Sequence, residues 1–281
     1  MSIDSLRATP TQQKVIVAHY ECAVSPIVHT FANTPLEVAY YIDGLEKEPT
    51  YSDPGAHKPL PKTIPSAVIK TSHSERTYPL VAANTILWLA HRGAVGFLSW
   101  TPSPLDPESV GFARIILRPV HGADQSHLKF AMLALKTALF SHGLEAIPVL
   151  GGVDDAALFI PFSDAPQYDA VRAWLHGLVD HAIELHPKLL IHEKRPGEKH
   201  TAARIACTVV SNAVGRFSAL PYSLAGTPDL PMVTPFDWTE LGTLENGDVT
   251  AANSAERLAK GDVFGDLAKY HANQRFADAA R

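Results

Sequence analysis

The sequence predicts an α+β protein in which a central mixed or antiparallel sheet is flanked by helices. Segments typical of strands alternate with segments typical of helices, but their order is not a regular βαβ series. Hydrophobic residues make up 46% of the 281 residues and charged residues 19%, which is typical of a globular chain with a substantial core. We therefore expect two packed layers of sheet and helix rather than a doubly wound parallel sheet.

Four helices are predicted from apolar residues at helical spacing. The strongest covers residues 124–144, with Asp124 or Ser126 as its N-cap and Gly143 at its end. A shorter helix at 84–94 has Asn84 as a possible N-cap. The other two cover residues 14–30 and 165–187, and a charged helix is expected near 254–261.

The predicted strands are short apolar runs bounded by turn residues. The polar, proline-rich segment 45–65 is expected to be a loop. The expected strands cover residues 35–44, 95–100, 112–119, 145–152, 156–162 and 203–212.

The strand "FARIILRP" at 112–119 carries two cations in an otherwise apolar run. Side chains alternate between the faces of a strand, so Arg114, Ile116 and Arg118 share one face. A face that carries two arginines is more typical of a polar site than of a core.

Charge and cysteine content limit the classes of partner and compartment. The net charge of −5 does not favour non-specific phosphate binding, so any nucleic-acid contact must come from a local patch. The only cysteines, Cys22 and Cys207, are expected to be buried thiols, which suits a reducing compartment. No apolar leader or membrane-length run occurs, so a cytoplasmic protein without membrane contact is expected.

Common catalytic motifs are absent from the sequence. The pair Gly151–Gly152 lacks the Lys-Ser/Thr of a P-loop, and no Gly-x-Ser-x-Gly motif occurs. The 14 histidines include no set with metal-ligand spacing. No metal or other cofactor is therefore expected from motifs alone.

A series of short segments nevertheless resembles a known family. "HYECAVSP", "LAHRGAVGFLSW", "IILRP", "LFIPF", "PYS", "TPFDWTEL" and "RLAKGD" occur in an order and spacing that resemble the polymerase domain of bacterial DNA ligase D. This domain belongs to the archaeo-eukaryotic primase superfamily, so the resemblance implies a two-layer primase-polymerase fold. It covers about residues 14–262, within one domain spanning 1–281 whose ends, 1–13 and 263–281, are peripheral.

The resemblance implies that three metal-binding carboxylates are replaced. The family strand reads Phe-Asp-Leu-Asp-Pro, and alignment through Pro119 places Ile116 and Arg118 at its two aspartates. Alignment through Asn212 places Thr208 at the third carboxylate. Because Mg²⁺ and Mn²⁺ prefer hard anionic oxygen ligands, we expect neither metal at this location.

The positions that bind nucleotide in the family also differ. The family's lysine and histidine in a glycine-rich segment correspond to Asp154 and Ala157. Its histidine before the tryptophan corresponds to Leu98, and its arginine after Pro-Tyr-Ser corresponds to Ala225. Cations that would hold a triphosphate are thus replaced by neutral or acidic residues.

Several cations remain that could contact nucleic acid. Lys14 aligns with a family lysine associated with the 5′-phosphate at a DNA end. Arg114 and Arg118 could contact phosphate, or they could pair with nearby acids such as Asp154 or Asp155. Lys194 and Arg195 begin a basic run that is either a phosphate contact or a solvated hairpin.

The leading hypothesis is a non-catalytic homologue, a pseudoenzyme of DNA-end repair by non-homologous end joining, that binds DNA ends or a partner such as a separate ligase or a Ku-like protein. One alternative is an active DNA- or RNA-directed nucleotidyltransferase whose acids are Asp106, Asp154 and Asp155. Another is a repurposed fold that binds an anion or a small molecule.

Overall fold

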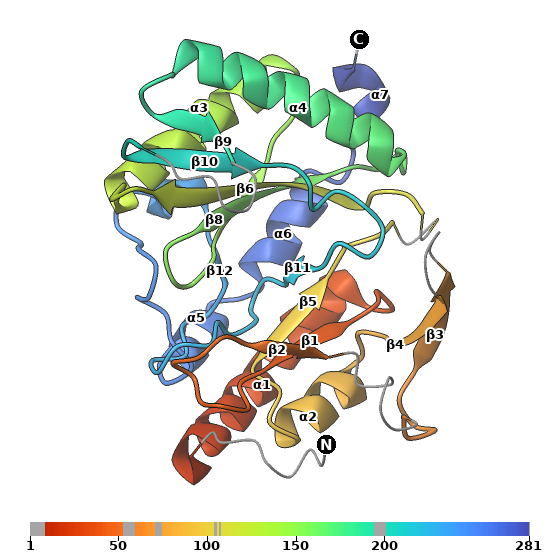
Figure 1. Cartoon of the computed structure of the whole chain (residues 1–281). Coiled ribbons are helices and arrows are strands. Elements are labelled where there is room, and N and C mark those ends of the chain that lie inside the picture. The colour runs from red at the N-terminus through yellow and green to blue at the C-terminus, as the bar shows by residue number, and fades with distance from the viewer. Residues whose placement is uncertain are drawn as a thin grey trace. The chain divides into compact units, whose positions relative to one another are not determined.

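A computed structural model describes residues 9–52, 60–70, 75–103, 106, 108–193 and 201–280 (Figure 1). Internal contacts group the chain into two compact units, each assembled from three segments of sequence. Both units contain helices and strands, which confirms the predicted α+β class. Unit 1 comprises Met1–Trp100, Phe217–Thr234 and Gly247–Gly265, and unit 2 comprises Thr101–Arg216, Pro235–Asn246 and Asp266–Arg281.

Unit 1 is built on a four-stranded sheet in the order β11-β5-β1-β2, with antiparallel neighbours. Its strands are β1 (Glu37–Tyr40), β2 (Thr50–Ser52), β5 (Gly96–Ser99) and β11 (Ser218–Ala219). A separate antiparallel hairpin consists of β3 (Ser66–Lys70) and β4 (Glu75–Pro79). Helix α1 (Pro10–Phe31) packs against α2 (Ala83–His91) and α5 (Ser254–Leu258).

Helix α1 begins four residues earlier than the sequence pattern predicts. Thr9 and Gln12 form a capping box, and Pro10 occupies the first helical position, where its missing N–H costs nothing. The buried face includes Ile16, Tyr20 and Ile27. Cys22 lies on the exposed face, so the prediction that both cysteines are buried holds only for Cys207.

The six-stranded sheet has the order β12-β7-β8-β6-β10-β9. Adjacent strands from β7 to β10 are antiparallel, and β9 runs parallel to β10. The strands are β6 (Phe112–Val120), β7 (Ile147–Leu150), β8 (Ala156–Pro161), β9 (Leu190–His192), β10 (Arg204–Thr208) and β12 (Thr234–Pro235). The sheet is therefore mixed but mainly antiparallel, as predicted.

Helices α3 (Gln125–Ser141) and α4 (Tyr168–Leu185) lie beside each other along this sheet (Figure 1). Asp124 caps α3 by accepting a hydrogen bond from the His127 backbone N–H, which decides between the two predicted caps. The predicted cap of α2 is wrong. That helix begins at Ala83, and the Asn84 side chain instead donates a hydrogen bond to the Thr63 carbonyl.

The last segment of the chain, Asp266–Arg281, belongs to unit 2. It contains most of α6 (Val263–Tyr270) and all of α7 (Phe276–Ala279). The Phe276 ring contacts Phe162 and Trp174. The Gln274 side chain donates hydrogen bonds to the carbonyls of Glu145 and Pro161. Among the described residues, no helix has the length and apolarity needed to cross a bilayer.

Candidate functional site

The two faces of β6 differ in burial and chemistry. One face is fully buried and apolar, and it consists of Ala113, Ile115 and Leu117. On the other face, Arg114 is buried, Ile116 is half-buried and Arg118 is exposed. Because α3 contacts β6, we assign the buried apolar face to the side covered by helix. The face that carries the two arginines is the candidate site.

Ile116 lies in a row of directly paired residues across the candidate face. Its register partners are Thr208 on β10 and Ala157 on β8, and Ala157 in turn pairs with Val149 on β7. Directly opposed residues in antiparallel strands project from the same face. The row therefore presents isoleucine, alanine, valine and one threonine hydroxyl, which is its only side-chain oxygen.

Arg118 forms an ion pair with Glu193. Glu193 directly follows β9, which runs parallel to β10, so non-local pairing brings this acid to the candidate face. The Arg118 and Glu193 side chains are 48% and 34% exposed. The sequence suggested Asp154 or Asp155 as the acidic partner; the bonded acid is Glu193, which no local pattern indicated.

Asp155 is packed into the hairpin between β7 and β8. A Cβ atom on Gly151 would lie 1.7 Å from the Asp155 Oδ1 atom, so a larger residue there would require the Asp155 carboxylate to move. Asn246 fixes the same turn by accepting from the Gly152 N–H and donating to the Asp155 carbonyl, both within 3.0 Å. Burial raises the pKa of the Asp155 carboxyl, and the nearby charge of Arg118 opposes this effect.

The other two candidate acids do not join Asp155 in a ligand cluster. Asp106 lies in a loop, where its carboxylate accepts hydrogen bonds from the Ser109 hydroxyl at 2.5 Å and the Glu108 N–H at 3.0 Å. These bonds lower the pKa of Asp106. Asp154 is exposed at the hairpin turn. Within the described ranges, no three His, Cys, Asp or Glu side chains are arranged to hold a metal ion.

Arg114 is almost completely buried at the other end of the candidate face. Its guanidinium donates to the carbonyl oxygens of Ser211 and Arg216 at 3.2 and 3.3 Å, and it lies 5.9 Å from the Phe159 ring centroid. The Asn212 side chain accepts from the Arg114 N–H and donates to the Arg114 carbonyl. Burial lowers the pKa of Arg114 to about 10, so the group stays charged at neutral pH.

Comparison with known proteins identifies the family of this fold. The family model for the LigD primase-polymerase domain matches residues 13–264. The chain belongs to the LigD primase-polymerase domain family. A solved structure, the polymerase domain of Mycobacterium tuberculosis ligase D in complex with DNA, is similar with a TM-score of 0.83 and 18% identity, over 97% of each chain. No curated protein matches this chain.

The LigD primase-polymerase match covers every position that the sequence analysis assigned to the family site. Ile116 and Thr208 are register partners, and Arg118 is two residues along the same strand face. The three positions thus lie close together, although they are far apart in sequence. Their correspondence with the family's metal ligands stays a prediction.

The remaining cations of the sequence analysis lie elsewhere. Lys14 is exposed on the first turns of α1, in unit 1, next to Gln13, whose side chain donates to the Ala90 carbonyl. Lys194 and Arg195 lie outside the described residues. A phosphate-binding role for any of these cations stays a prediction.

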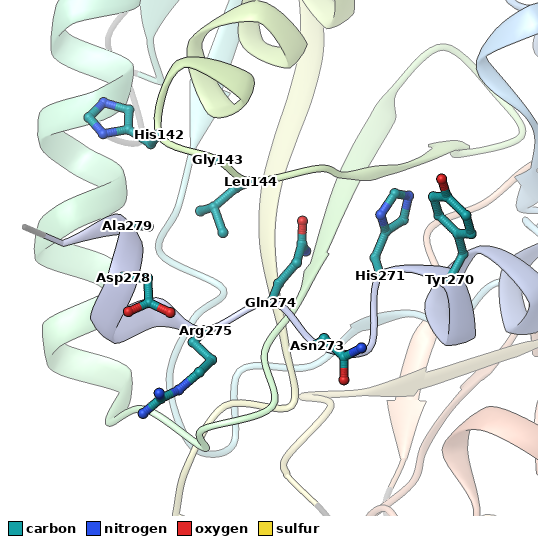
Figure 2. Close-up of a pocket in the computed structure, with 10 residues that line it drawn as sticks. All are labelled: His142, Gly143, Leu144, Tyr270, His271, Asn273, Gln274, Arg275, Asp278 and Ala279. Carbon is teal, nitrogen blue, oxygen red and sulfur yellow. The ribbon is translucent and has the colours of Figure 1, made fainter.

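A separate cavity of about 490 Å³ lies between the turn after α3 and the final segment of unit 2. Figure 2 shows His142 and Leu144 on one side of Gln274 and Tyr270 and His271 on the other, with Arg275 pointing away from both imidazoles. The Gln274 amide is already bonded to Glu145 and Pro161. The polar groups of this cavity do not converge on a common point, unlike those of a typical ligand site.

Proposed function

We propose that this chain is a LigD-type primase-polymerase homologue that binds nucleic acid ends and does not transfer nucleotides at the β6 face. The observation that carries the proposal is the row in which Ile116 and Thr208 oppose each other in register. In the family that the chain resembles, these positions and that of Arg118 hold carboxylates. The correspondence itself rests on sequence resemblance.

The chemistry of these side chains supports the loss of metal-dependent transfer. A two-metal site needs several anionic oxygens to hold the ions and to organise the triphosphate. Isoleucine has no donor atom, and a threonine hydroxyl is one neutral oxygen. Arg118 would repel a divalent cation, and Glu193, the acid beside it, is engaged in its ion pair.

Binding to DNA ends is supported by Lys14 and by the family. Lys14 is exposed and aligns with the family lysine associated with a 5′-phosphate. The similar M. tuberculosis polymerase domain was solved in complex with DNA. We infer a cytoplasmic role in DNA-end repair in which this chain acts together with a separate ligase or a Ku-like protein.

Primer extension tests the loss of catalysis. Purified protein is expected to add no nucleotide to a primed DNA end in the presence of Mn²⁺. Extension that is abolished by the triple variant Asp106→Asn, Asp154→Asn, Asp155→Asn would overturn the proposal and favour an active nucleotidyltransferase with acids outside the family pattern.

A restored carboxylate set tests the correspondence of the site itself. The triple variant Ile116→Asp, Arg118→Asp, Thr208→Asp is expected to bind Mn²⁺ where the wild type does not, measured by the loss of the free Mn²⁺ electron paramagnetic resonance signal. The matched control places three aspartates at exposed sites, Leu133→Asp, Lys188→Asp and Leu185→Asp. Equal binding by both triple variants would contradict the assigned positions.

DNA-end binding is tested by fluorescence anisotropy with a 5′-phosphorylated duplex. The wild type should bind more weakly as salt rises, and Lys14→Ala should weaken binding and lower the slope of log K against log salt by about 1. Lys188→Ala, which removes an exposed charge from unit 2, is the control. No binding at low salt, or equal losses in both variants, would contradict the role of Lys14.

A further inference from the structure

We propose that the outer face of α3 is a self-association surface through which two copies of this chain form a weak antiparallel dimer. Three large apolar side chains on this helix are exposed to solvent. Phe130 is 64% exposed, Leu133 is 42% exposed and Phe140 is 65% exposed. Single exposed apolar residues are ordinary, but three on one helix face form an apolar patch, and such patches are typical of interaction sites.

The exposed residues follow the spacing of a helix-pairing seam. Phe130, Leu133, Thr137 and Phe140 are separated by three, four and three residues, which is the a/d pattern of a heptad. The Thr137 hydroxyl donates to the Leu133 carbonyl at 3.0 Å within the same helix. Its hydrogen-bonding need is therefore met, and Thr137 does not oppose burial of the seam.

The opposite face of α3 is already occupied by the core of unit 2. Leu128, Ala131, Leu135 and Leu139 are fully buried there. The outer seam is therefore additional to the apolar face that the fold requires. A helix that is apolar on both sides is expected to be covered on both sides.

The charges beside the seam do not prevent two copies from approaching. Lys129 forms an ion pair with Glu245 at 3.1 Å, and the Lys136 ammonium lies 4.6 Å from the centroid of the Trp238 ring. Both cations are thus held toward the segment that contains Trp238 and Glu245. Across a symmetric interface, compensated charges repel each other less than free lysines would.

The occupant that fits this seam best is a second copy of the same seam. The positions 130, 133, 137 and 140 are symmetric about residue 135. In an antiparallel pair, Phe130 would therefore meet Phe140 of the second copy, and Leu133 would meet Thr137. A two-fold interface requires such a self-complementary patch. Antiparallel helices also place opposite dipole ends together.

The available area predicts a weak dimer. At roughly 150–250 Å² for each phenylalanine, the exposed parts of four phenylalanines would bury roughly 400–650 Å². A stable complex usually buries at least about 1,200 Å² in total, so the side chains around the seam must supply the rest. Dimerisation should therefore depend strongly on protein concentration.

Sedimentation velocity over a concentration series tests the proposal. The wild type should shift from monomer toward dimer as its concentration approaches about 1 mM, the range of weak complexes. Leu133→Lys should stay monomeric, whereas Leu185→Lys, a matched change at an exposed leucine at the end of α4, should behave as the wild type. Circular dichroism melting establishes that both variants are folded.

Three results would overturn the self-association surface. The first is a wild type that stays monomeric over the whole concentration range. The second is a Leu133→Lys protein that dimerises like the wild type, and the third is an equal loss of dimer in Leu133→Lys and Leu185→Lys. The test does not involve DNA or catalysis, so its outcome is independent of the proposed function.

Cysteine cross-linking tests the antiparallel arrangement. In a Cys22→Ser background, an equimolar mixture of Leu133→Cys and Thr137→Cys should form a disulfide-linked dimer faster than either variant alone. The native Cys207 is buried and should not compete. Faster cross-linking of each variant with itself would indicate a parallel pair and overturn this arrangement.

Discussion

The two faces of β6 show how one strand can serve a core and a polar site at once. On the helix-covered face, Ile115 and Leu117 are fully buried and contribute through the removal of apolar surface from water. On the other face, Arg114 and Arg118 each have specific partners, but at very different depths. From this comparison we expect burial, more than residue type, to decide how much each side chain contributes to the free energy of unfolding.

The largest expected effect is on the helix-covered face. Leu117→Ala removes a fully buried side chain and leaves a cavity, so it should lower the free energy of unfolding by about 2–5 kcal/mol. Urea unfolding followed by circular dichroism measures the change. If Leu117→Ala lowers the free energy of unfolding less than Arg114→Met or Arg118→Gln does, the expected difference between the two faces is wrong.

Arg114→Met should have the next largest effect. This variant keeps much of the side-chain volume but removes the charged donor from the carbonyls of Ser211 and Arg216. Hydrogen bonds from charged groups contribute about 1.5–3 kcal/mol, and removal of the buried charge offsets part of that loss. We expect a net destabilisation of about 2 kcal/mol in the same unfolding experiment. A more stable variant would indicate that desolvation of the guanidinium outweighs its bonds.

Asp155→Asn should change the pH dependence of stability. Because burial raises the pKa of Asp155, the native state binds its proton more readily than the unfolded state. The ionised carboxylate is therefore unfavourable in the native state, and stability from this group falls as pH rises from the unfolded pKa through the folded one.

The asparagine variant should be more stable than the wild type at neutral pH, and its advantage should disappear as pH falls through the folded pKa. Thermal unfolding at a series of pH values measures this difference. Asp154→Asn removes the same charge from the exposed neighbour and serves as the control. A constant difference across pH would contradict the predicted pKa shift.

The smallest effect is expected at the exposed end of the site. Arg118→Gln breaks the ion pair with Glu193, but both side chains are partly exposed, so the loss should be about 0–1 kcal/mol. High salt should reduce the difference further. Destabilisation as large as that of Arg114→Met would mean that the pair is part of a stronger network around Asp155.

Local sequence patterns predicted the elements that form this comparison. The apolar run 112–119 became β6, and the apolar spacing with Asp124 as cap became α3. The β3–β4 hairpin was missed because residues 75–79, "ERTYP", do not alternate between apolar and polar side chains. Three of these five residues are exposed. The two-residue strands β11 and β12 are too short to produce any periodic signal.

The candidate site was predicted less completely because its partners come from distant segments. The shared face of Arg114, Ile116 and Arg118 follows from strand alternation alone. Glu193, by contrast, reaches Arg118 only through the parallel pairing of β9 with β10. Asn212 bonds to both backbone groups of Arg114 from 98 residues away, a contact that no local pattern encodes.

The interleaving of the two units along the chain has a consequence for synthesis. Each unit takes three segments, so the chain passes from one unit to the other at residues 100, 216, 234, 246 and 265. A growing chain cannot complete unit 1 before residue 265 has emerged, and unit 2 is completed only by the segment after it. A unit that still lacks its last segment leaves apolar surface uncovered, so we expect chaperones to assist this protein while it is still on the ribosome.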